Sequence, residues 1–355
     1  MTHPIRSVLA AIFVGFSAAH AADEPTPVEA RLAELKTERQ AEWDAKSITL
    51  GDKTMKFEYR VLGEAPAQGR SLFISMHGGG GAPARVNDQQ WQNQIGLYTP
   101  KEGVYLAPRA PTDTWNLWHE AHIDAFVDRL IENAIAFEGV NPNRIYLMGY
   151  SAGGDGTYQL APRMADRFAA ASMMAGHPNE ASPINLANLP FMLWVGENDS
   201  AYNRNTVTKQ WGARLDELAA ELPGHYVHEL HVVAGAGHWM NRKDAAALEW
   251  MSAHTRNPWP TSIRWRQDDV THDRFYWLQL DAEGVRAHRA SGGTISATVT
   301  ANHIDLETPD GLHTLSLMLS SRLLDLTKPV TVTWNQTPLP PQTVKIGRAS
   351  CRERV

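Results

Sequence analysis

Continuous apolar runs alternate with amphipathic stretches through the middle of the chain. The apolar runs cover residues 71–77, 103–110, 143–150, 168–176, 190–199 and 225–238. Between them, residues 122–138, 152–164, 206–222 and 242–255 carry apolar side chains at helical spacing. Strands that are apolar on both faces and separated by helices are typical of a largely parallel sheet covered by helices on both sides. The pattern therefore predicts an α/β domain over residues 47–257.

Two further elements are expected before this alternation begins. Residues 25–46 combine helical apolar spacing with many charge pairs four residues apart, which predicts an amphipathic helix. We expect this N-terminal helix, within residues 22–46, to pack on the α/β domain. Residues 47–63 form two β runs about a Gly-Asp-Lys turn and predict a hairpin.

The pattern changes after the sequence Asn-Pro-Trp-Pro at residues 257–260. Residues 261–345 contain short β runs between turns and no convincing helix, so we predict a small all-β domain, such as a partial sandwich. It is either a structural partner of the first domain or a module that binds carbohydrate or a surface. The aromatic run at residues 274–280 has the pattern of a core strand, which favours the structural role.

Both ends of the chain have sequences that belong to neither domain. Residues 1–21 join one basic residue, an apolar stretch and a small-residue cleavage site, which predicts a signal peptide and export to the periplasm or the outside. Its apolar part is too short to span a bilayer, and no later segment is long enough. Residues 346–355 match the translation of a sequencing adapter or form a basic tail. They include the single cysteine, Cys351, so we expect no internal disulfide.

Composition removes several function classes. The 355 residues are 43% hydrophobic and 20% charged, as in globular proteins, and the net charge is −6 without any run of Lys or Arg. We therefore expect no nucleic-acid partner and no anionic membrane surface. The oligomeric state does not follow from the sequence.

A serine between two glycines follows one of the predicted strands. In Gly149-Tyr150-Ser151-Ala152-Gly153 the strand ends and a helix begins, which is the setting of a nucleophile elbow. So sharp a turn brings backbone segments so close that side chains at Gly149 and Gly153 would collide. The turn would present the hydroxyl of Ser151 above the sheet, at the positive end of the helix.

A serine hydroxyl is a weak nucleophile, so it needs a base and an acid that orients the base. Asp199 lies at the end of the apolar run 190–199, the second predicted strand after Ser151. His238 lies at the end of the next run, 225–238. Glu197 and Glu180 also lie near positions where an acid is expected. Asp199 is favoured because it stands three residues after Gly196 in a Gly-x-x-Asp pattern.

These residues, with the glycine-rich segment after His77, resemble the α/β-hydrolase superfamily over about residues 47–255. The resemblance implies Ser151 as nucleophile, Asp199 as acid and His238 as base. It also implies an oxyanion hole formed by the backbone N–H of Ala152 and that of Gly78 or Gly79. The segment is similar to secreted esterases of the feruloyl-esterase and polyhydroxybutyrate-depolymerase type, and to the catalytic domain of the prolyl oligopeptidase clan.

No metal or other cofactor is expected. His225, His228 and His231 recur every three residues, but on a strand this spacing sends alternate members to opposite faces. His119 and His122 fit ordinary polar positions at the start of a helix.

The chemistry implied is therefore acyl transfer at serine, and we predict a carboxylic ester hydrolase without a lid. Trp115, Trp118 and Trp239 are candidates to line a pocket for aromatic or sugar-bearing esters, with packing as the alternative role of each. A serine peptidase of the prolyl oligopeptidase type and a non-catalytic binding protein on the same fold remain as alternative functions.

Overall fold

The computed structural model describes residues 10–12 and 27–341. The described residues divide into two compact units, one of residues 27–256 and one of residues 257–341 together with 10–12. We call them the α/β unit and the β-rich unit. The predicted signal peptide, apart from residues 10–12, and the predicted tail at 346–355 lie outside the described residues.

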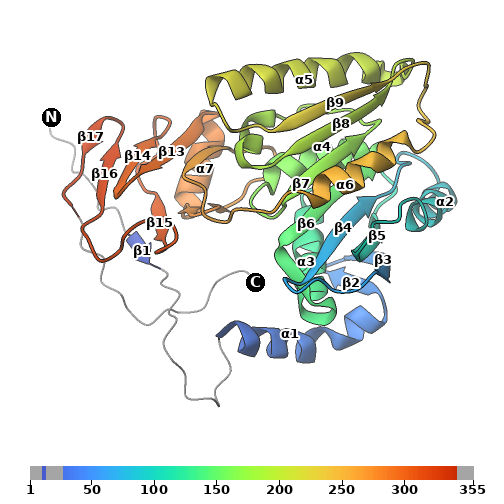
Figure 1. Cartoon of the computed structure of the whole chain (residues 1–355), viewed down its shortest axis with the longest axis horizontal. Helices are drawn as coiled ribbons and strands as arrows, with labels where there is room; N and C mark the ends of the chain where they lie inside the picture. The colour runs from blue at the N-terminus through green and yellow to red at the C-terminus, as the bar shows by residue number, and fades with distance from the viewer. Residues whose placement is uncertain (1–9, 13–26, 342–355) are drawn as a thin grey trace. The chain divides into compact units, whose positions relative to one another are not determined.

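The α/β unit is built on an eight-stranded sheet of order β2-β3-β5-β4-β6-β7-β8-β9 (Figure 1). Its strands are β2 (Ser47–Leu50), β3 (Lys53–Leu62), β4 (Arg70–Met76), β5 (Gly103–Arg109), β6 (Val140–Tyr150), β7 (Ala170–Met174), β8 (Phe191–Gly196) and β9 (His228–Val233). The hairpin β2–β3 and the pair β3–β5 are antiparallel, and all later pairs are parallel. The predicted parallel sheet and the predicted hairpin are both confirmed.

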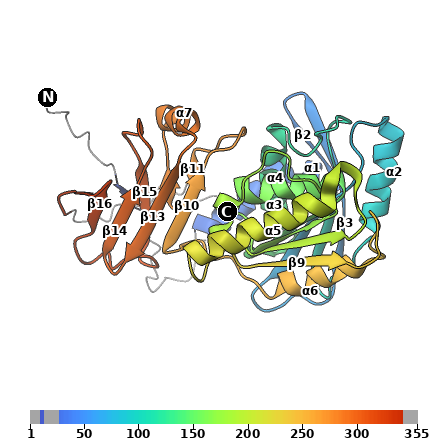
Figure 2. The ribbon, with the colours of Figure 1, turned by 90° about the horizontal axis from the view of Figure 1, so that it is seen from above.

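Helices lie on both faces of this sheet. They are α1 (Pro27–Asp44), α2 (Ala84–Ile95), α3 (His122–Glu138), α4 (Ala152–Arg163), α5 (Arg204–Glu221) and α6 (Ala247–Ser252), with short 3₁₀ helices at η1 (Pro183–Asn188), η2 (Ala201–Asn203) and η3 (Lys243–Ala246). Helix α6 packs on the face opposite α5 (Figure 2). Large side chains fill the space between α6 and the sheet, among them Tyr146, Met148 and Met251.

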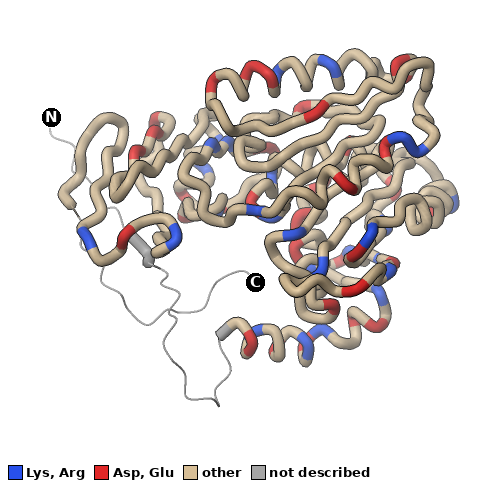
Figure 3. Tube along the Cα trace, viewed as in Figure 1, with Lys and Arg blue, Asp and Glu red and all other residues tan. Residues whose placement is uncertain are grey.

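The N-terminal helix packs on the α/β unit, as the sequence predicts. Glu42 accepts hydrogen bonds from Arg129 and Asn133 of α3, and Trp43 Nε1 donates to Glu138 at 3.1 Å. Acidic and basic side chains are interspersed along α1 and α5 (Figure 3). Among the described residues, no helix is both long enough and apolar enough to cross a membrane.

The β-rich unit contains a five-stranded and a four-stranded sheet. The first comprises β10 (Ser262–Arg266), β13 (Thr294–Thr300), β14 (His303–Glu307), β16 (Thr331–Trp334) and β17 (Thr337–Pro338). The second comprises β1 (Ala10–Ile12), β15 (Ser316–Leu319), β12 (Leu278–Gln279) and β11 (Arg274–Phe275). Phe275, Tyr276 and Trp277 are buried, in agreement with the core role expected for this aromatic run.

The prediction of no helix after residue 257 is wrong. Helix α7 (Ala282–Ser291) begins at Asp281, whose side chain accepts a hydrogen bond from the Gly284 N–H, and ends at Gly292 in the left-handed conformation. An aspartate at the N-cap and a glycine after the last turn are strong signals for the start and the end of a helix. The segment between them is mostly polar, with only Gly284 and His288 buried, so it lacked the apolar period that would have indicated a helix.

Candidate active site

The elbow between β6 and α4 holds the serine in a strained backbone conformation. Ser151 has φ 59° and ψ −121°, in a region that L-residues seldom occupy. A Cβ on Gly149 would lie 2.0 Å from the Gly153 carbonyl oxygen, and one on Gly153 would lie 2.1 Å from the Met76 carbonyl oxygen. Only glycine fits at either position, which is the crowding that the sequence predicted.

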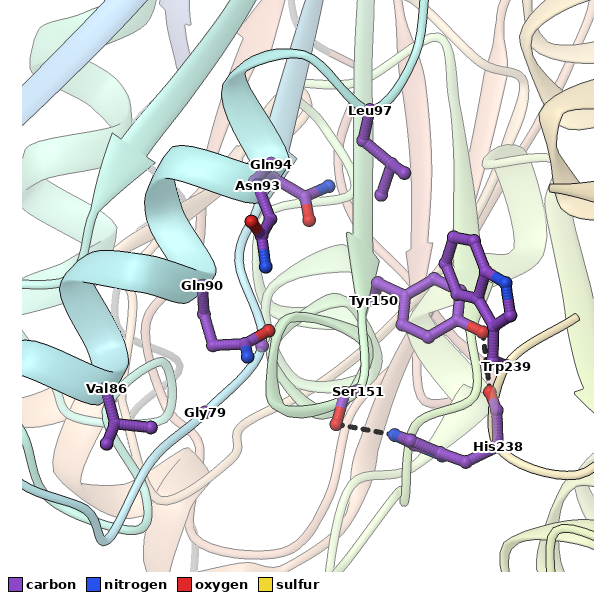
Figure 4. Close-up of a pocket in the computed structure, with 11 residues that line it drawn as sticks. Gly79, Val86, Gln90, Asn93, Gln94, Leu97, Tyr150, Ser151, His238 and Trp239 are labelled. Carbon is purple, nitrogen blue, oxygen red and sulfur yellow. Dashed lines mark hydrogen bonds between the residues drawn. The ribbon is translucent and has the colours of Figure 1, made fainter. Parts of the chain in front are cut away.

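The structure joins Ser151, His238 and Asp199 in one chain of hydrogen bonds, of which Figure 4 shows the contact between Ser151 and His238. His238 Nε2 lies 2.9 Å from Ser151 Oγ, and His238 Nδ1 lies 2.8 Å from Asp199 Oδ2. In the neutral tautomer that this arrangement requires, Nδ1–H donates to the carboxylate and Nε2 accepts the serine proton. The imidazole is therefore placed to act as a general base.

Asp199 is set by the turn after β8 and is buried. Its N–H donates to the Gly196 carbonyl at 3.1 Å, and Arg204 Nη1 lies 3.9 Å from Asp199 Oδ1. A Cβ on Gly196 would lie 2.0 Å from the Gly237 carbonyl oxygen, so the acid turn and the histidine loop pack backbone against backbone. This close approach brings the carboxylate to the imidazole.

The two alternative acids have other partners. Glu197 Oε2 accepts the Gly235 N–H at 2.8 Å, and Glu180 Oε1 accepts from Gln159 Nε2 at 3.2 Å. Of the three candidates, the structure places only Asp199 against His238. Glu197 instead holds the loop that carries the histidine.

Tyr150, the residue before Ser151, also holds this loop. Its hydroxyl donates to the His238 carbonyl at 2.6 Å and accepts the Met240 N–H at 3.2 Å. Burial raises the pKa of Tyr150, so the hydroxyl stays neutral and able to donate. Sequence reasoning did not find this contact, because the motif sets no requirement on the residue before the serine.

The glycine-rich segment after β4 lies beside the serine. Gly78 is so close that a Cβ on it would come within 3.1 Å of Ser151 Cβ, and Gly79 adopts φ +109°. Ala152 is the first residue of α4, and the first bond of this helix is donated later, by Asp155 to the Ser151 carbonyl. Gly78 and Gly79 therefore line the cavity beside Ser151, and Ala152 follows the serine directly; the role of these three residues as oxyanion donors stays a prediction.

Buried side chains fix this segment. Asn87 Oδ1 accepts the Gly80 N–H at 2.8 Å, while Asn87 Nδ2 donates to Asp113 at 2.8 Å. His77 accepts the Ala110 N–H at Nε2 (3.1 Å), and its Nδ1 lies 2.6 Å from the Gly78 carbonyl oxygen. Burial lowers the pKa of His77 to about 4, so the ring is neutral and keeps both contacts.

A cavity of about 530 Å³ opens at Ser151. Its walls come from three regions: the glycine-rich segment, helix α2, and the elbow with the histidine loop. The lining residues are Gly78, Gly79, Val86, Gln90, Asn93, Gln94, Leu97, Tyr150, Ser151, His238 and Trp239. Sequence reasoning missed helix α2 and all of its contribution, because Ala84–Ile95 is too polar to show an apolar period.

The three predicted tryptophans have different positions. Trp239 lines the cavity, with 48% of its surface exposed. Trp115 is 65% exposed and lies outside the cavity lining. The predicted substrate contact of Trp118 is wrong, because its side chain is buried and its Nε1 donates to the His77 carbonyl at 2.9 Å. Trp118 therefore supports the glycine-rich segment from below.

The histidines of the β9 region have separate partners. His225 Nδ1 lies 3.2 Å from the Ala187 carbonyl oxygen, His228 pairs with Asp216, and His231 stacks on Trp194. Within the part of the chain that the structure describes, no cluster of His, Cys, Asp or Glu is arranged to hold a metal ion.

No protein-family model matches the sequence, and a search of curated proteins gives no match. Among solved structures, the chain is similar to a thermostable esterase, with 18% identity over 59% of this chain and 62% of that one and a TM-score of 0.44. It is similar to a poly(3-hydroxybutyrate) depolymerase from Bordetella parapertussis, with 16% identity over 58% and 86% of the two chains and a TM-score of 0.42. A putative dipeptidyl aminopeptidase IV from Bacteroides ovatus matches with 14% identity over 59% and 34% and a TM-score of 0.41.

The chain's own topology identifies its fold. The strand order, the antiparallel second strand and the serine at the turn between β6 and α4 are those of the α/β-hydrolase fold.

Proposed function

We propose that this protein is a serine hydrolase that cleaves carboxylic esters through an acyl-enzyme. The observation that carries the proposal is the hydrogen-bonded chain from Ser151 through His238 to Asp199 at the mouth of a cavity. Folding does not require such a chain at an exposed site, because water can satisfy the hydrogen bonds of serine and histidine equally well there. Its value lies in activating the hydroxyl.

In the proposed reaction, Ser151 Oγ attacks the ester carbonyl carbon while His238 Nε2 takes the hydroxyl proton. The resulting oxyanion accepts hydrogen bonds from Ala152 N–H and from Gly78 or Gly79 N–H. The carbonyl then re-forms, the bond to the alcohol oxygen breaks, and His238 returns the proton to the departing alcohol. Asp199 stabilises the transient imidazolium.

Water completes the cycle by the same route. His238 takes a proton from water as its oxygen attacks the acyl carbon, and the proton passes to Ser151 Oγ when the acid leaves. The products are one carboxylic acid and one alcohol, and the enzyme returns to its starting state. No external cofactor takes part in the proposed steps.

The ester preference is supported by the cavity's lining. None of the described residues that line it is Asp, Glu, Lys or Arg, so the lining offers no counter-charge to a peptidase substrate with a free amino terminus. Trp239 and Tyr150 supply aromatic surface, which suits aromatic or carbohydrate-linked esters.

We further propose that the chain is exported after removal of residues 1–21, which N-terminal sequencing of secreted protein would test.

The test is a substrate panel on purified protein: p-nitrophenyl acyl esters, methyl ferulate and proline p-nitroanilides. We expect turnover of esters, its loss in Ser151→Ala, and its retention in Ser252→Ala, a matched change on α6. Preferential turnover of the anilides would favour the peptidase. Ester hydrolysis that survives in Ser151→Ala would refute the assigned nucleophile.

A further inference from the structure

One wall of the catalytic cavity is a row of side chains on helix α2. Val86, Gln90, Asn93 and Leu97 recur at steps of four, three and four residues, which places them on one side of the helix and the turn that follows it. The two ends of the row are aliphatic and the two central members are amides. Figure 4 shows Gln90 and Asn93 pointing from α2 into the space beside Ser151 and Tyr150.

The Gln90 amide lies close to the reacting centre. Gln90 Oε1 is 3.6 Å from the point that a Cβ on Gly78 would occupy, and that point is 3.1 Å from Ser151 Cβ. Gln90 is half-buried, yet among the described residues its amide has no hydrogen-bond partner. A neighbouring amide shows the contrast, since Gln94 is buried and its Nε2 donates to Ser75 Oγ at 2.7 Å.

Asn93 is also partly uncommitted. Its Oδ1 accepts from Gln89 Nε2 at 3.0 Å, which fixes the amide and leaves its Nδ2 group toward the cavity. Together the two amides offer donors and an acceptor from one wall. Groups of this kind bind hydroxyls and carbonyls, and they do not compensate a full charge.

The direction of the reaction decides which part of the ester meets this wall. His238 must return a proton to the departing alcohol, so the alcohol lies beside His238 Nε2. In Figure 4 helix α2 stands on the other side of Ser151 from the imidazole. The acyl group therefore extends toward α2. The ring of Tyr150 lines the same cavity and lies 5.6 Å from the Trp239 ring and 5.9 Å from the His238 ring.

We propose that Gln90 and Asn93 recognise a hydroxyl group on a neutral acyl chain whose flat part lies against Tyr150. The cavity volume of about 530 Å³ is large enough to hold such an acyl group. The absence of charged side chains from the cavity lining disfavours carboxylate- or ammonium-bearing acyl groups. This specificity rests on the proposed ester hydrolysis, and it assigns Gln90 and Asn93 a role in selecting the acyl group.

The test compares two methyl esters that differ by one hydroxyl: methyl 3-(4-hydroxyphenyl)propionate and methyl 3-phenylpropionate. We expect the wild type to prefer the first by about tenfold in kcat/KM, the effect of one or two hydrogen bonds at a partly hydrated site. Gln90→Leu and Asn93→Leu should each reduce the preference, and the double variant should abolish it. Gln92→Leu, an exposed position on the same helix outside the cavity, is the matched control and should retain it.

Each outcome decides between the site and the function. Equal turnover of the two esters by the wild type, or a preference that the double variant keeps, overturns the amide site and leaves the hydrolase standing. Turnover of other esters but of neither of these two overturns the acyl group assigned here. A wild type that hydrolyses no ester and does not react with a fluorophosphonate overturns the proposed function and the site with it.

Discussion

Replacing Tyr150 with Phe should weaken catalysis through the loop that carries His238. The ring would remain in the cavity wall, and only the hydroxyl would be lost. That hydroxyl makes two contacts with the loop, one to the His238 carbonyl at 2.6 Å and one from the Met240 N–H at 3.2 Å. Met240 is fully buried, so its N–H would be left without a partner.

The expected magnitude follows from these two bonds. Leaving a buried polar group unpaired costs about 1–3 kcal/mol, and the exposed side of the loop can recover part of this from water. We expect the free energy of unfolding to fall by about 2 kcal/mol. We expect kcat to fall about tenfold because the imidazole loses part of its fixed position, while KM changes little since the cavity surface is kept.

Tyr146→Phe is the matched control. Tyr146 lies four residues earlier on the same strand, is buried, and donates to the His254 carbonyl at 2.9 Å, away from the triad. Urea unfolding and steady-state kinetics on a p-nitrophenyl ester should show a loss of stability in both variants and a loss of kcat only in Tyr150→Phe. Equal kcat values in the two variants would refute the positioning role.

Three further predictions concern the acid, the oxyanion segment and the elbow. Asp199→Asn should lower kcat by about 10³–10⁴ because the amide no longer favours the required tautomer, whereas Glu197→Gln should change kcat by less than about tenfold; equal losses would contradict the choice of acid. Burial lowers the pKa of His77 to about 4, whereas the same histidine in the unfolded chain has a pKa near 6.5. The unfolded state therefore binds this proton first, and the free energy of unfolding should decrease as the pH falls from 6.5 to 4. In His77→Gln this loss is absent, so the difference between the two urea midpoints should narrow on acidification, and a constant difference would contradict the buried neutral ring. Gly153→Ala should prevent correct folding, measured by the yield of soluble protein and its circular dichroism, since the new methyl would stand 2.1 Å from a β4 carbonyl oxygen, while Gly96→Ala, with open space around it, should fold normally.

The sequence predicts those parts of the fold that depend on strong local patterns. Residues 122–138 were predicted as a helix and form α3 with the same bounds, because their apolar side chains lie on one buried face. The elbow was predictable because the backbone leaves no room for a side chain at Gly149 or Gly153, so only glycine fits there. The order of Asp199 and His238 after the serine reflects the order of parallel strands.

The missed elements lack such patterns. Helix α2 exposes most of its surface and buries only Asn87 and Gln94, both polar, so its role is visible only in three dimensions. Helix α7 was missed although Asp281 and Gly292 mark its ends. Trp118 illustrates a different limit. The sequence alone does not distinguish a tryptophan that faces the substrate from one that packs in the core near the same site. Its burial follows from the glycine-rich segment packing over it.

The central claim is that His238 activates the hydroxyl of Ser151, and reaction with a fluorophosphonate measures this directly. We expect one label per chain in the wild type, mapped to Ser151 by mass spectrometry of the digested protein. Ser151→Ala should take up no label, and His238→Ala should react at least a hundredfold more slowly. A label on another residue, or an unchanged labelling rate in His238→Ala, would contradict the account.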